Sequence, residues 1–291
     1  MEAEQQNLPF IKNLASSDRK TRTSALTSLR AFLSARQNAT ALSPVDVLKL
    51  WKGLFYALWM CDRPIPQQAL CSELADLINV LPPEAVVPWL RGFWATMARE
   101  WVGIDVLRLD KFLLLVRRVL GAALVWMKAQ TPASERGATP VVDGTRKRKK
   151  KLSRGNRWDP ERVDGIIGLL GEWPFSVDVE DARAGETDEQ GKSSGEKKIV
   201  PRDVPSGLRL HVLDIWVDEA EKAGLLGDDE ADGDGSDDPE AQRILQRITE
   251  LVDNLEKGTL SKAVRLRSKQ SLLDPRLPWN SIAGEEEDSD E

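Results

Sequence analysis

The sequence is poor in the side chains that catalysis and metal binding most often use. Its 291 residues include one histidine, His211, and two cysteines, Cys61 and Cys71. Two thiols fit a reducing compartment and cannot build the disulfide framework of a small secreted domain. A zinc site would need more histidine or cysteine ligands than the chain offers. We therefore expect no metal and no cofactor.

Sequence motifs of the common enzyme classes are also missing. The chain has no P-loop, no dinucleotide-binding fingerprint, no G-x-S-x-G and no H-E-x-x-H. An acidic run from residue 228 resembles a calcium loop, but Pro239 stands where the bidentate glutamate is required. His211, Cys61 and Cys71 lie in apolar helical patterns, so we interpret them as structural. We predict that the protein is not an enzyme and takes no small-molecule substrate.

Long hydrophobic runs are absent too. No apolar stretch approaches the roughly 18–20 residues of a membrane helix. The first residues, Met1 to Glu4, are acidic and do not lead into an apolar segment, unlike a secretory signal. We expect no membrane partner.

Charge is distributed very unevenly along the chain. The net charge of −6 arises from +5 over residues 1–131, +7 over residues 132–157 and −18 over residues 158–291. Such an asymmetry indicates a protein that meets polyanions and basic partners.

What the chain does contain is a succession of helix signals. Ser43, Pro44 and Asp46 form an N-terminal capping pattern, and Pro88 can open a later helix. A long helix from about 104 to about 129 carries apolar positions on more than one face, which places it in the core; they include Leu107, Phe112, Leu113, Val116, Val119, Leu120, Ala123 and Trp126. No stretch alternates with period two. We predict an all-α fold, an irregular HEAT-like helical-repeat layer.

Composition divides the chain into four parts. We predict a helical core over 5–131, a basic disordered linker over 132–157, and a helical return over 158–225 with a disordered loop at about 181–198. An acidic, partly disordered tail follows over 226–291, with one or two helices at about 240–270. Three tryptophans in poorly periodic segments, Trp158, Trp173 and Trp279, are candidate anchors within the chain or in a partner.

The basic linker is one candidate functional segment. Six consecutive cations repel one another and resist packing, so they are exposed. They serve nuclear import, contact RNA phosphates, or both, and sequence does not separate these readings. The candidate residues are Arg146, Lys147, Arg148, Lys149, Lys150, Lys151, Arg154 and Arg157.

Three segments, in order, carry a resemblance to a known family. They are KLWKGLFYALWMCDRP at 49–64, FWATMAREWVGIDVLRLDKF at 93–112 and GLRLHVLDIWVDE at 207–219. Together they resemble the eukaryotic ribosomal-RNA-processing protein 1 family over about residues 5–225. The tail beyond these residues resembles no family that we can name.

The resemblance implies an all-helical, non-enzymatic protein of the nucleus and nucleolus. It implies a scaffold function in early large-subunit (pre-60S) particles, where it supports pre-rRNA processing. The partners implied are other assembly factors, including a Brix-domain protein and a WD-repeat protein, with pre-rRNA nearby. It supplies no catalytic residue. The alternative is a direct pre-rRNA-binding protein that acts through residues 146–157.

A second candidate site lies around Gly103, where charged residues gather between two expected helices. They are Arg99, Glu100, Asp105, Arg108, Asp110 and Lys111. Asp105, in the first turn of the long helix, and Arg108 are three residues apart and can pair. The group is either a buried polar lock between two helices or a patch that binds a partner.

Overall fold

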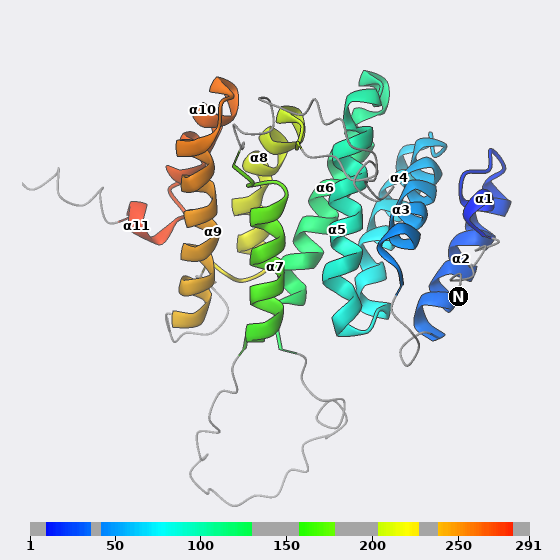
Figure 1. The fold of residues 1–291 in the computed structure, drawn as a ribbon, viewed down its shortest axis with the longest axis horizontal. Coiled ribbons are helices and arrows are strands. Elements are labelled where there is room, and N and C mark those ends of the chain that lie inside the picture. Colours follow the sequence, from blue (N-terminus) through cyan, green and yellow to red (C-terminus); the bar gives the residue numbers. More distant parts are fainter. Residues whose placement is uncertain (1–9, 36–41, 130–156, 178–202, 227–237, 282–291) are drawn as a thin grey trace, which may run out of the picture.

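The computed structural model describes residues 10–35, 42–129, 157–177, 203–226 and 238–281 (Figure 1). Over these residues the fold is helical without a β-strand, which confirms the all-α class, and one isolated bridge joins Lys128 to Trp158. The helices are α1 (Ile11–Leu14), α2 (Arg19–Ala35), α3 (Pro44–Trp59), α4 (Pro64–Ala75), η2 (Asp76–Val80), α5 (Pro83–Glu100), η3 (Trp101–Gly103), α6 (Val106–Trp126), α7 (Pro160–Glu172), α8 (Ser206–Lys222), α9 (Pro239–Gly258), α10 (Lys262–Leu272) and α11 (Pro278–Ser281).

Local sequence signals explain where several helices begin. The Ser43 hydroxyl accepts the Asp46 N–H at 3.1 Å, so the predicted cap of α3 is confirmed. Asp159 and Asp238 cap α7 and α9 in the same way, and a proline follows each of them at the first helical position. These signals act within one turn of the chain and can therefore be read from sequence.

Two boundaries differ from those expected. α5 begins at Pro83, and Pro88 lies inside it. Pro83 already supplies the favoured first-turn proline, and α5 continues through Pro88 although this residue has no N–H to donate. Asp105 is the N-cap residue of α6 rather than part of its first turn, and its side chain makes no capping bond.

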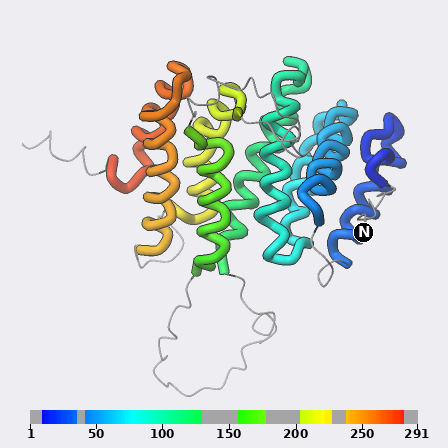
Figure 2. The backbone as a smooth tube through the Cα atoms, viewed as in Figure 1, coloured from blue at the N-terminus to red at the C-terminus, as the bar shows by residue number. Residues whose placement is uncertain are grey.

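Successive helices from α2 onward alternate in direction and form two layers (Figures 1 and 2). α3, α5, α7 and α9 pack side by side in one layer, and α4, α6, α8 and α10 pack in the other. One edge of the array carries the α3–α4, α5–α6 and α9–α10 connections, and at the opposite edge α4 connects to α5, α6 and α8 end, and α7 and α9 begin. This arrangement agrees with stacked antiparallel helix pairs, while the HEAT-like assignment stays a prediction.

The segment predicted as an acidic tail contributes directly to this array. α9 packs on α7, and α10 packs on α8 and α9. α9 buries a full apolar stripe, made of Ala241, Ile244, Leu245, Ile248, Val252 and Leu255. The last two long helices therefore continue the same hydrophobic core, because a continuous stripe must be covered by neighbours.

The core is rich in aromatic contacts between α3 and α5. The Trp51 ring lies 5.0 Å from Trp89 and 4.9 Å from Phe93, and its indole N–H donates to the Trp89 carbonyl at 2.8 Å. A Cβ added at Gly92 would lie 2.4 Å from a Val47 methyl, so glycine is what permits this close approach. Among the described residues, no helix is long and apolar enough to cross a membrane.

Candidate functional site

The Gly103 corner, residues 99–111, joins the end of α5 to the start of α6. The 3-10 turn η3 and the Asp105 N-cap reverse the chain here. The corner lies on the same edge of the array as the α3–α4 connection, and Lys111 makes contacts with that connection (Figure 1). Four of the six charged residues predicted here form local pairs, and one reaches across to another helix.

Lys111 is the residue that reaches across. Its side chain is 3 % exposed, and its Nζ donates to the carbonyl oxygens of Trp59 at 2.7 Å and Cys61 at 3.0 Å. Burial lowers the pKa of Lys111, and Asp62, whose Oδ1 lies 3.7 Å from Nζ, partly offsets this effect. The ammonium group thus ties α6 to the open carbonyl groups at the end of α3, the geometry expected of a polar lock.

The other charged residues of the corner pair within their own segment. Arg99 Nε lies 2.8 Å from Glu100 Oε1, and both are partly buried. Arg108 Nη1 lies 2.6 Å from Asp105 Oδ2, which confirms the expected pairing. The Arg108 guanidinium also lies 5.0 Å from the Trp59 ring centroid. Asp110 is exposed.

Beside these charges lies an apolar feature that the sequence reading missed. Val102, Val106 and Leu107 are 85 %, 85 % and 96 % exposed. Leu107 was expected in the core, but the first turn of α6 lies beyond the residues that cover the rest of the helix, and burial begins at Lys111 and Phe112. Because large apolar side chains are seldom left exposed together without a partner, this trio makes the corner a candidate contact surface.

The residues on either side of the basic segment meet at a second candidate site. We call it the neck, and it comprises residues 127–129 and 157–159. Ala129 N–H donates to the Arg157 carbonyl and Asp159 N–H to the Met127 carbonyl, both at 2.9 Å. Arg157 is exposed, and Arg146 to Lys151 and Arg154 lie outside the described residues. Their predicted contacts with RNA or an import receptor stay predictions.

Trp158 fills the centre of the neck. It is 1 % exposed, and its indole N–H donates to Asp238 Oδ2 at 3.0 Å. Arg157 Cζ and Lys128 Nζ each lie 5.7 Å from its ring centroid. Trp158 and Trp173 therefore anchor within the chain, whereas Trp279 is 40 % exposed.

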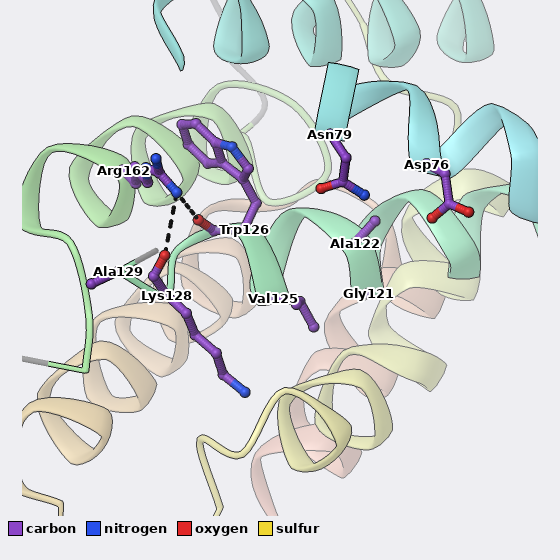
Figure 3. Close-up of a pocket in the computed structure, with 9 residues that line it drawn as sticks. All are labelled: Asp76, Asn79, Gly121, Ala122, Val125, Trp126, Lys128, Ala129 and Arg162. Atoms are coloured by element: carbon purple, nitrogen blue, oxygen red, sulfur yellow. Dashed lines mark hydrogen bonds between the residues drawn. The ribbon is translucent and has the colours of Figure 1, made fainter. Parts of the chain in front are cut away.

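A pocket of about 400 Å³ lies next to the neck, between η2 and the facing ends of α6 and α7 (Figure 3). Arg162 closes one side: its guanidinium lies 4.7 Å from the Trp126 ring centroid and donates to the carbonyl oxygens of Trp126 and Lys128. The remaining polar lining consists of Asp76, Asn79 and Lys128. No nucleophile and base face each other in this lining, so the pocket gives no support for a catalytic site.

His211, the one histidine, lies between α8 and α6. Its Nε2 donates to the Leu113 carbonyl oxygen at 2.9 Å. The pKa of His211 is lowered, mainly by burial and also by the nearby Arg117. The bond to Leu113 opposes this shift but does not cancel it. This geometry agrees with the structural role predicted for His211.

We expect stability to depend on pH through this residue. Because the pKa of His211 is lower in the folded chain than in the unfolded chain, the unfolded state takes up more protons as pH falls below about 6.5. The free energy of unfolding should therefore decline between about pH 7 and pH 5. His211→Gln, which keeps a donor near Leu113, should flatten this decline in urea titrations. Identical pH profiles for the two proteins would exclude the effect.

Comparison with known proteins identifies the family of this chain. The profile of the Nop52 family, described as a nucleolar protein, matches residues 5–143 and 192–291. The chain belongs to this family.

Members of the family from mouse and human show the same relationship. Ribosomal RNA processing protein 1 homolog A of Mus musculus is 34 % identical over 220 residues, which cover 75 % of this chain and 35 % of that protein. Homolog B of the same species is 42 % identical over 225 residues, covering 75 % of this chain and 24 % of that protein. Homolog A of Homo sapiens is 42 % identical over 126 residues, 42 % of this chain and 27 % of that protein. The chain thus spans about a third or less of these relatives.

The extent of the Nop52 match bears on both candidate segments. It includes the Gly103 corner and continues to residue 291, so the family likeness does not end near residue 225 as expected. It omits residues 144–191, which contain the whole basic run. The part shared with the Nop52 family includes the Gly103 corner and the helices of the array other than α7, which lies in the omitted segment.

Proposed function

We propose that the chain is a non-catalytic scaffold in the assembly of the large ribosomal subunit. In this proposal it works in early nucleolar pre-60S particles, where it supports pre-rRNA processing. The family description and the names of the relatives support the nucleolar location and the link to ribosomal RNA processing. Its partners would be other assembly factors, including Brix-domain and WD-repeat proteins.

One observation carries the choice of a scaffold. Val102, Val106 and Leu107 are almost fully exposed on a corner whose position Lys111 fixes against α3. A rigid apolar surface with paired charges at its rim is the pattern of a protein–protein contact. It supports a working surface on the helical array.

Co-sedimentation tests this proposal. We expect the wild-type protein to co-sediment with large-subunit precursor particles, and Val102→Ser/Leu107→Ser to lose that association with an unchanged melting temperature. Val125→Ser, on an exposed residue at the other end of α6, is the matched control and should behave as wild type. A wild-type protein absent from the particle fractions would contradict the scaffold function, and an unaffected double variant would contradict the use of the corner.

Charge reversal at Arg99 and Arg108 separates the two roles weighed for this corner. A large fall in melting temperature would assign both arginines to the polar lock. Lost particle association with unchanged melting would assign them to the partner patch. Both arginines form ion pairs inside the corner, with Glu100 and Asp105, and we expect the second result.

Direct binding of pre-rRNA is the second candidate function. Arg157 is exposed at the neck, and the net charge of +7 over residues 132–157 favours phosphate contacts. Each contact with single-stranded RNA should add about −0.7 to the slope of log affinity against log salt concentration. A filter-binding titration that shows no RNA complex at modest salt would reject this alternative.

A further inference from the structure

The outer face of α10 differs from the other outer surfaces of the array. Lys262, Leu266, Lys269 and Leu273 follow one another at spacings of four, three and four residues, so they lie along one side of the helix. We call them the α10 stripe. Val264 and Ser268 lie on the opposite side and are buried against the array. The stripe therefore faces away from α8 and α9.

The two leucines of the stripe are open to solvent. Leu266 is 60 % exposed and Leu273 is 64 % exposed. The two lysines are exposed as well, and neither forms an ion pair with a described residue. α10 itself contains four basic residues and no acidic one; they are Lys262, Arg265, Arg267 and Lys269.

The orientation of α10 is fixed by contacts with α8. Arg267 Nη1 lies 2.6 Å from Asp214 Oδ1. Just after α10, Arg276 lies 2.8 Å from Glu221 and 3.0 Å from Asp218. Burial opposes ionisation of Asp218, but its bonds to Arg276 and Arg117 lower its pKa below the ordinary range. These ion pairs fix α10 on α8, so the stripe keeps its position on the array.

The opposite end of the array shows what a solvent-facing end looks like. α2 exposes none of the large hydrophobic side chains that are exposed elsewhere in the described residues, and its outward positions are arginine, lysine, serine, threonine and alanine. Terminal helices of stacked arrays need such a polar outer face to remain soluble. The α10 stripe differs in exposing two leucines between its lysines, which indicates that another element packs there.

We infer that the α10 stripe is a docking surface for an acidic amphipathic helix of another protein. Leucines seven residues apart fit the apolar seam of a packed helix, and lysines beside them fit flanking aspartate or glutamate. The chain's own end, residues 285–291, is acidic but offers no large apolar side chain to cover the leucines. RNA would be held by the lysines alone, because aliphatic side chains provide no stacking platform for bases.

This inference rests on the proposed scaffold function, because it adds a second protein-binding surface to the Gly103 corner. A synthetic helical peptide with leucine at every seventh position and glutamate at the flanking positions serves as the probe. Its twin carries lysine in place of glutamate. Fluorescence anisotropy with the full chain should show binding of the glutamate peptide and at least about tenfold weaker binding of the twin.

Variants of the stripe sharpen the test. Lys262→Glu/Lys269→Glu should reverse the preference between the two peptides, and Leu266→Ser/Leu273→Ser should weaken binding by about tenfold or more. Val125→Ser, at an exposed residue outside both the stripe and the corner, should bind as wild type. Circular dichroism melting should be unchanged for all of these exposed sites, so that lost binding is not lost folding.

The contrary outcomes are distinct. Equal binding of both peptides, no binding of either, or an RNA oligonucleotide held through Lys262 and Lys269 in place of the peptide would each overturn the inference. If the wild type also co-sediments with precursor particles in that case, the scaffold function stands and only the α10 stripe fails. If it does not, both fail.

Discussion

Replacement of Lys111 by methionine is expected to lower the free energy of unfolding by about 2 to 4 kcal/mol. Methionine keeps the length and volume of the side chain but removes its donors. The Cys61 carbonyl retains a bond from Gln67 Nε2 at 2.7 Å, so the loss falls mainly on the Trp59 carbonyl at the end of α3. That carbonyl lies in a partly buried position and would lose its donor, which is costly for a polar group that water reaches poorly.

Urea unfolding followed by circular dichroism measures this effect, and two controls define it. Lys52→Met removes an exposed lysine from α3 and should change the free energy by less than about 0.5 kcal/mol. Asp62→Asn should also have a small effect, because Asp62 is 76 % exposed and lies 3.7 Å from Lys111 Nζ. A Lys111→Met protein as stable as the Lys52→Met protein would show that Lys111 does not hold α6 to α3.

The helices could be predicted because their signals are local. Ser43 and Pro44 mark the start of α3 within one turn, and the spacing of Trp51, Phe55 and Trp59 marks its buried side. Lys111 illustrates the limit of such reading. Its partners are carbonyl oxygens some 50 residues earlier, and no side-chain pattern announces a backbone acceptor. A lysine at a core position reads as a surface residue until the fold brings those carbonyl groups to it.

Leu107 was misplaced, whereas helices at about 240–270 were expected and only the packing of α9 on the array was not. Periodicity shows which side of a helix is apolar but not how far the neighbouring helices extend, so Leu107 was assigned to the core although its side chain is 96 % exposed. The acidity of residues 226–291 suggested a tail, but average charge says nothing about one buried stripe. Ile248 and Leu255 are buried because α9 packs on α7 and α10.

Trp158→Ala is expected to destabilise the protein by about 3 to 5 kcal/mol, the range for removing a fully buried large aromatic side chain. The indole fills the neck between the end of α6 and the start of α7 and holds Asp238, whose other oxygen caps α9. Its loss therefore opens a cavity where three helices meet. Trp158→Phe, which keeps most of the ring but not the N–H, should have a smaller effect of about 1 to 2 kcal/mol.

Trp279 supplies the control for the Trp158→Ala prediction. Trp279 is 40 % exposed on the short helix α11, so Trp279→Ala should change the free energy by less than about 1 kcal/mol. Circular dichroism is the appropriate probe, because both variants alter tryptophan fluorescence directly. If the neck joins the two halves of the array, Trp158→Ala should also broaden the urea transition, since α3 to α6 and α7 to α10 would then unfold less cooperatively. A Trp158→Ala protein as stable as the Trp279→Ala protein would remove the neck from the contacts that hold the array together.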